Sequence, residues 1–133
     1  MNKEQLIRRG YVPLRKNRFA IRFNFDKNIE PFMFKSFFYT EDTLSLTILD
    51  SSFFFSPAYF DVNGPNIENE SITVELVDKV GEVVAEILFE GVRFERYVVN
   101  EFDYSKDEPM ETVALFTFDS VKHKTLHNAP TTA

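Results

Sequence analysis

The sequence predicts an all-β fold, either a small β-barrel or a two-sheet sandwich of about seven strands with at most one short helix. Apolar and polar residues alternate over several segments, turn residues recur about every 8 to 12 residues, and only the first residues suggest a helix. The chain has 133 residues, 44% of them apolar, which suits one hydrophobic core. We therefore expect a single domain over residues 1–133.

The first three strands are expected over residues 19–25, 32–39 and 44–48. The first and third of these segments alternate apolar with polar or small side chains, which is the period of a strand with one buried face. Before them, residues 1–16 are expected to form an arm, in which one or two helical turns end at Gly10 and an extended connector follows.

Residues 51–69 interrupt this pattern. Phe53, Phe54 and Phe55 form an apolar triplet between serines, and a turn-rich loop follows over residues 61–69. Because consecutive strand residues face opposite sides, at least one of the three rings points away from the local core. Two interpretations stay open: a strand buried between two layers, or a plug that inserts into an adjoining subunit.

Four further strands are expected before a tail over residues 122–133. They lie at residues 71–77, 83–89, 92–100 and 112–121, with a hairpin turn at 79–82, a bulge or kink at Gly91 and a polar turn at 103–109. The segments 83–89 and 112–118 are apolar on both faces. A second sheet, the N-terminal helix or another subunit must therefore cover their outer side.

Phenylalanine is unusually frequent, with 16 Phe against 5 Tyr and no Trp. Its ring has no polar group, so a chain this rich in phenylalanine needs a large dry core or a dry interface. On the expected strands, the phenylalanine rings present more apolar surface than the core of one small sandwich can bury. We interpret the excess as interface.

Charge is distributed unevenly along the chain, whose net charge is −6. Residues 1–35 carry a net +6, residues 36–121 a net −14, and two lysines after them add +2. We expect the basic end to pair with an acidic surface of this protein or of a neighbouring subunit. Binding to nucleic acid is less favoured, because a protein with a pI of 4.9 is repelled by a phosphate backbone. A monomeric OB-like module that binds single-stranded nucleic acid through residues 8–23 remains an alternative, since basic and aromatic residues interleave there.

Composition argues against catalysis and against a bound cofactor or metal. The chain has no Cys and only 4 Gly, and it contains no phosphate-binding loop and no nucleophile elbow. His123 and His127 have the spacing of a metal-binding pair on a helix, but they lie in the predicted tail without a carboxylate at ligand spacing. Acidic residues also occur in pairs, as the two carboxylates of a glycosidase do, but these pairs lie in predicted turns and we interpret them as solvent-exposed. We therefore expect no enzyme activity, no metal and no cofactor.

No segment predicts association with a membrane. Residues 1–5 lack the apolar run of a signal peptide, and no apolar run approaches the ~20 residues that span a bilayer. The absence of cysteine fits a reducing compartment. We expect a soluble protein that is made inside a cell.

One segment in the second half resembles a known family. The turn Phe102-Asp103-Tyr104-Ser105, a short acidic stretch and the strand over residues 113–119 follow one another as in the tail tube proteins of contractile-tailed bacteriophages. Residues 17–23 are similar to the opening strand of that family, and residues 72–78 are similar to its mid-chain strand, which ends in Asp. These loose patterns cover about half of the chain.

The resemblance implies subunits that form hexameric rings, which stack into a tube through which DNA leaves the capsid. The chain would be a structural virion protein of the tail, assembled in the host cytoplasm, with copies of itself, the sheath and the baseplate as partners. DNA would pass through the lumen without specific binding. A tube-initiating baseplate protein or a tail-completion protein is an alternative. A sandwich that binds carbohydrate or a host surface is a further alternative, from another class.

Candidate residues fall into three roles. The expected subunit interface consists of Phe53, Phe54, Phe55, Phe102, Tyr104 and Phe116. The residues expected to contact the next ring or the sheath are Arg8, Arg9, Arg15 and Lys16. Acidic residues expected in the lumen, where negative charge keeps DNA from adhering, are Glu75, Glu86 and Glu95. The loops at residues 61–69 and 101–110 would bridge stacked rings.

Overall fold

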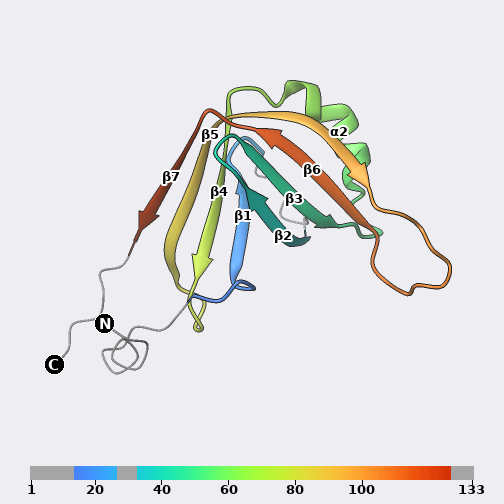
Figure 1. The fold of residues 1–133 in the computed structure, drawn as a ribbon, viewed down its shortest axis with the longest axis horizontal. Helices are drawn as coiled ribbons and strands as arrows, with labels where there is room; N and C mark the ends of the chain where they lie inside the picture. The colour runs from blue at the N-terminus through green and yellow to red at the C-terminus, as the bar shows by residue number, and fades with distance from the viewer. Residues whose placement is uncertain (1–13, 27–32, 127–133) are drawn as a thin grey trace.

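A computed structural model of the chain describes residues 14–26 and 33–126 (Figure 1). Within these residues the fold is all-β with a single short α-helix, as predicted; the helix expected within residues 1–10 lies outside them. The elements in chain order are β1 (Phe19–Phe23), β2 (Met33–Tyr39), β3 (Thr43–Leu49), α2 (Ser56–Asn63), the 3-10 turn η1 (Gly64–Asn66), β4 (Glu70–Val77), β5 (Val83–Val99), β6 (Glu111–Thr117) and β7 (Ser120–Thr125).

The described strands form one antiparallel sheet that does not close into a barrel. Their order is β1-β4-β5-β6-β3-β2, and β7 also pairs with β5. The first part of β5 lies between β4 and β7, whereas its last part pairs with β6. The long strand β5 therefore belongs to two layers, which we call the β4 layer (β1, β4, β7) and the β3 layer (β2, β3, β6). This arrangement is that of the predicted two-sheet sandwich.

The two layers diverge at Gly91 in the middle of β5. Gly91 has a φ of +67°, and a Cβ at this position would lie 2.2 Å from a carboxylate oxygen of Asp119. The Asp119 N–H donates a hydrogen bond of 2.8 Å to the Glu90 carbonyl, so the chains stay in contact at the bend. The sequence predicts two strands here, over residues 83–89 and 92–100. The structure has one, because glycine lets the backbone bend without ending the strand.

The end of the chain also differs from the prediction. The strand expected over residues 112–121 is divided: β6 ends at Thr117 and β7 begins at Ser120, across the bend of β5. The tail expected from Lys122 is in part a strand, since β7 pairs with β5 as far as Thr125. Four of the six β7 side chains are exposed. Hydrophobic alternation therefore gives little signal for β7.

The core lies between the layers, and α2 closes it on one side. The Phe60 ring of α2 stacks on Phe94 of β5 with centroids 4.7 Å apart. The first turn of α2 is held by Asp50, whose carboxylate accepts a hydrogen bond of 2.7 Å from the Ser56 N–H. The sequence predicts an interruption and a turn-rich loop over residues 51–69 rather than a helix. It misses α2 because the helix has only 8 residues and its capping carboxylate comes from outside it.

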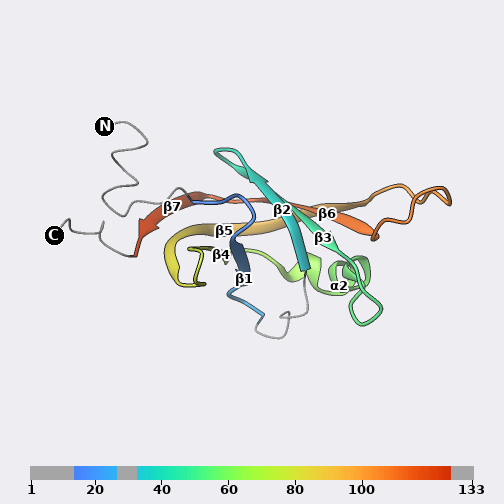
Figure 2. The same ribbon diagram turned by 90° about the horizontal axis from the view of Figure 1, so that it is seen from below.

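The edge strands β1 and β2 lie near each other without backbone pairing, and aromatic rings join them (Figure 2). The rings of Phe19 and Phe37 pack edge to face with centroids 5.1 Å apart, and those of Phe23 and Phe34 lie 6.0 Å apart. These contacts close the seam between the layers with apolar surface. A large part of the phenylalanine content thus serves the core of this chain, so the excess is not interface alone.

Candidate assembly surfaces

Two neighbouring loops, both of which carry exposed aromatic rings, lie at the end of the molecule opposite β7 (Figures 1 and 2). One connects β3 to α2 and the other connects β5 to β6, and the Asp50 N–H joins them by a hydrogen bond of 2.9 Å to the Met110 carbonyl. Phe53 is 96% exposed and Phe102 is 78% exposed. We call the four exposed rings the aromatic end: Phe53, Phe55, Phe102 and Tyr104.

The other two residues expected at a subunit interface lie elsewhere. Phe116 is 1% exposed, and its ring packs against Phe23 and Phe94 in the core, so it is left out of the interface proposed below. Phe54 is half-buried, with its ring 5.7 Å from that of Tyr59. Since the triplet lies in a loop before α2, its interpretation as a strand buried between two layers is wrong.

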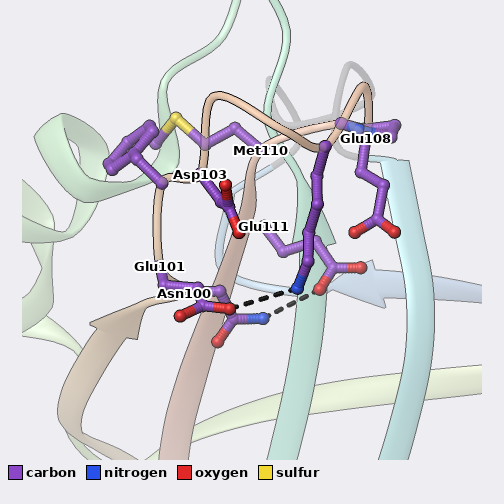
Figure 3. Close-up of a pocket in the computed structure, with 9 residues that line it drawn as sticks. Asn100, Glu101, Asp103, Glu108, Met110 and Glu111 are labelled. Carbon is purple, nitrogen blue, oxygen red and sulfur yellow. Dashed lines mark hydrogen bonds and ion pairs between the residues drawn. The ribbon is translucent and has the colours of Figure 1, made fainter.

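The β5–β6 loop is held by its own polar side chains. The Asp103 carboxylate accepts hydrogen bonds from the Ser105 N–H at 2.9 Å and the Ser105 hydroxyl at 2.7 Å, and these bonds lower the pKa of Asp103. Lys106 forms an ion pair of 3.2 Å with Glu101. The loop surrounds a hollow of about 560 Å³, which is lined by Phe102 together with acidic side chains (Figure 3).

The base of this loop is fixed by Glu111 at the start of β6. Its carboxylate accepts a hydrogen bond of 2.8 Å from the Asn100 side chain and forms an ion pair with Lys35 of β2. The bond to Lys35, followed by the bond to Asn100, lowers the pKa of Glu111, and the same contact raises the pKa of Lys35. The end of β5, the start of β6 and the edge strand β2 are therefore linked at one point.

The acidic residues expected in a lumen lie on the side of β4 and β5 that faces away from the core. Glu75 and Glu86 are register partners on the neighbouring strands β4 and β5. Arg22 forms an ion pair of 2.9 Å with Glu75, and Lys124 of β7 stands opposite Glu86. Glu95 lies farther along β5, where it accepts a hydrogen bond of 3.0 Å from a threonine hydroxyl of β6. This face therefore carries both signs of charge rather than negative charge alone.

Half of the basic residues expected to contact another ring lie within the described chain. Arg15 and Lys16 are exposed in the turn that precedes β1, whereas Arg8 and Arg9 lie outside the described residues. In the neighbouring β1, Phe23 is buried and Phe19 packs against Phe37. The rings of β1 are thus occupied in the core, which disfavours the stacking of bases that the nucleic-acid alternative requires.

The β3 layer has a second apolar surface on its outer side. Thr112, Ala114 and Phe116 of β6 are buried, while the alternate residues Val113 and Leu115 are half-buried on the opposite face. On this face Phe38 lies in register with Leu115 across Ser45, and Val98 pairs with Val113. Met33 pairs with Leu49 on the same layer, and Phe38, Met33 and Val98 are all exposed. The prediction that β6 is apolar on both faces is confirmed.

The described residues contain no group of three or more His, Asp or Glu side chains that could hold a metal ion. His123 lies in β7, where its Nε2 and the Tyr39 hydroxyl share a hydrogen bond of 2.9 Å, and His127 lies outside the described residues. None of the described helices is long and apolar enough to cross a membrane.

No protein-family model and no curated protein matches the sequence. Solved structures share the fold. A chain of the anti-feeding prophage (AFP) baseplate aligns with a TM-score of 0.65 at 12% identity, covering 88% of this chain and 99% of that one. A chain of the PVC sheath–tube complex, an extracellular contractile injection system, aligns at 0.66 and 11% identity, covering 95% and 99%. A chain of the AFP tube-terminating cap aligns at 0.61 and 14% identity, covering 86% and 92%. The fold is thus one that occurs in tube and baseplate assemblies, as the resemblance to tail tube proteins implies.

Proposed function

We propose that this chain, whose fold occurs in baseplate, sheath–tube and cap structures of contractile injection systems, is a structural subunit that assembles with itself into rings stacked as a tube. The observation that carries the proposal is the aromatic end. Four largely exposed aromatic rings gather on two linked loops, and monomeric proteins rarely leave such a surface to water. The chain then acts by assembly rather than by catalysis.

In this proposal six copies close a ring around a channel, and DNA passes through the stacked rings in a virion tail that is assembled in the host cytoplasm. Sheath and baseplate proteins are the expected partners, in keeping with the assemblies in which the similar chains occur. Glu75, Glu86 and Glu95 face the channel. Because Arg22 and Lys124 lie beside the first two, the wall carries both signs of charge, which supports passage of a cargo without tight binding.

Negative-stain electron microscopy and sedimentation velocity of the purified chain test the proposal. We expect rings or tubes that appear with rising concentration and are lost in the double variant Phe102→Ser/Tyr104→Ser. The matched control is Val80→Ser, which removes an exposed apolar side chain from the β4–β5 turn at the other end of β5. A chain that remains monomeric at every concentration, with no rings or tubes, contradicts self-assembly.

The second candidate is a protein that starts or completes the tube. It is favoured by the similarity to chains of the AFP baseplate and the AFP cap. The two roles differ in the length of the product. A main tube protein forms tubes of variable length, whereas an initiating or completing protein stops at single rings. The same micrographs therefore distinguish them.

A further inference from the structure

The hollow in the β5–β6 loop has the size and chemistry of a binding site for a cationic side chain. Its volume of about 560 Å³ falls in the usual range of ligand pockets, about 300–1,000 Å³. Phe102, Pro109 and Met110 contribute apolar lining, and Figure 3 shows Glu101, Asp103 and Glu108 around the same space. Lys106, which pairs with Glu101, is the one basic residue in the lining, so acidic side chains outnumber it. A guanidinium group binds carboxylates through paired hydrogen bonds and stacks on aromatic rings, so arginine fits this surface best.

The N-terminal segment of this chain supplies that chemistry. Residues 1–18 contain six basic side chains and one acidic side chain, with Arg8 and Arg9 adjacent and apolar residues on either side of them. Residues 100–111, which form the loop and its base, contain five acidic side chains and one basic side chain. The two segments are therefore complementary in charge, and each also carries apolar surface.

The point at which the segment joins β1 and the hollow lie at opposite ends of β5. The turn that precedes β1 lies at the start of β5, since the Arg18 carbonyl accepts a hydrogen bond of 3.2 Å from the Val77 N–H and Val77 pairs with Val83. From Arg15, a chain of six residues reaches Arg9 over about 20 Å when fully extended. The hollow begins beyond Val99, and the path along β5 from Val83 is about 50 Å. Figure 1 shows β5 arching across the molecule without folding back.

We propose that the segment around Arg8 and Arg9 of one copy docks into the β5–β6 hollow of the next copy, head to tail. The contact joins two different surfaces, so each added copy presents a new hollow and the contact can repeat without closing. The inference rests on the proposed function, in which it joins successive rings. It gives the basic residues a defined partner, namely Phe102, Glu101 and Glu108 of a neighbouring copy.

A labelled peptide of residues 1–18 tests the docking directly. It is titrated into the full-length protein at concentrations where the protein sediments as a monomer, and fluorescence anisotropy reports binding. We expect saturable binding that weakens at high salt, because the contact includes exposed charges. The peptide Arg8→Glu/Arg9→Glu is expected to bind roughly tenfold more weakly or worse.

The protein variant Phe102→Ala/Glu108→Arg is expected to lose peptide affinity to a similar degree. Its matched control is Val80→Ala/Glu82→Arg, which changes the same residue classes at two exposed positions of the β4–β5 turn. The variant Glu101→Arg/Glu108→Arg is expected to bind the charge-reversed peptide better than the native peptide. Unchanged binding to Phe102→Ala/Glu108→Arg, equal binding of both peptides, or no binding at all overturns the proposal.

Failure of the docking and failure of the proposed function are distinguishable in micrographs of the full chain. When the docking proposal is correct, Glu101→Arg/Glu108→Arg, which leaves the aromatic end unchanged, forms rings that do not stack. Stacking at the wild-type level by this variant overturns the docking and leaves the tube function standing. Absence of rings from the wild-type protein contradicts the tube function, whereas the peptide titration still decides whether the hollow binds the N-terminal segment.

Discussion

The carboxylate of Asp50 accepts a hydrogen bond of 2.6 Å from the hydroxyl of Thr112, which has no exposed surface. The same carboxylate accepts bonds of 2.7 Å and 2.6 Å from the N–H and the hydroxyl of Ser56, also fully buried. One side chain thus ties the loop after β3 to the start of α2 and to β6. These contacts position both loops of the aromatic end.

Replacement of Asp50 is therefore expected to be costly. Asp50→Ala leaves the hydroxyl of Thr112 and both donors of Ser56 without their acceptor, and we expect a loss of roughly 3 kcal/mol in the free energy of unfolding. Thr112→Val removes one of these bonds together with its donor and is expected to cost about 1 kcal/mol. Urea unfolding measures both values. Similar stability of Asp50→Ala and the wild type would show that water replaces the carboxylate.

The bend of β5 predicts a strong effect of Gly91→Ala. The new Cβ would lie 2.2 Å from an Asp119 oxygen and 2.8 Å from the Asp119 Cβ, and a φ of +67° is unfavourable for alanine. We expect a loss of roughly 3 kcal/mol or an insoluble chain. The control is Gly81→Ala, which has a φ of +89° but no atom within 4 Å of the new Cβ, so it is expected to cost only about 1 kcal/mol. Equal midpoints in thermal unfolding would contradict the close approach at Gly91.

The Glu111–Lys35 pair predicts a pH-dependent contribution to stability. Because the pKa of Glu111 is lower in the folded chain, its contribution is fully present above the unfolded pKa of glutamate, about 4.3, and is lost as the pH falls through the folded value. Glu111→Gln is therefore expected to be less stable than the wild type at pH 7, with a difference that shrinks below about pH 4. Urea titrations between pH 3 and pH 8 measure this difference. A gap that stays constant with pH would contradict an ionic contact. The raised pKa of Lys35 affects stability at high pH instead, because the contribution of its charged form is lost only in strongly alkaline solution.

The phenylalanine triplet predicts different outcomes for substitutions at neighbouring positions. Phe55 is 50% exposed, so Phe55→Asp is expected to fold normally and to reduce assembly. Phe54 is less exposed than Phe55, and its ring packs against Tyr59. Phe54→Asp is therefore expected to lower the unfolding midpoint in addition to reducing assembly. Phe116→Ala, in the core, is expected to lose about 3–5 kcal/mol. Circular dichroism melts combined with sedimentation separate the two effects, and an unfolded Phe55→Asp would place that ring in the core.

Most strands are predictable from the sequence because each has a repeating pattern of apolar residues. β1, β2, β3 and β4 lie within about two residues of their predicted ranges. The local pattern is weaker at β7, because its lysines and histidine do not alternate with apolar residues. This strand forms because its backbone pairs with β5. The local pattern is weakest at α2, which depends on a carboxylate from Asp50 and on the stacking of Phe60 on Phe94.

By itself, the sequence determined the fold class, the doubly apolar character of β6, and the uneven distribution of charge, because composition and alternation are local properties of the chain. Only the tertiary structure decided which phenylalanines are core and which are surface. Phe116 and Phe102 are the same residue type, yet one is packed among rings from α2 and β5 and the other projects from a loop. The physical reason is that burial depends on which distant segments pack around a side chain, and these segments meet only after β5 has bent at Gly91 and placed the two layers on either side of one core.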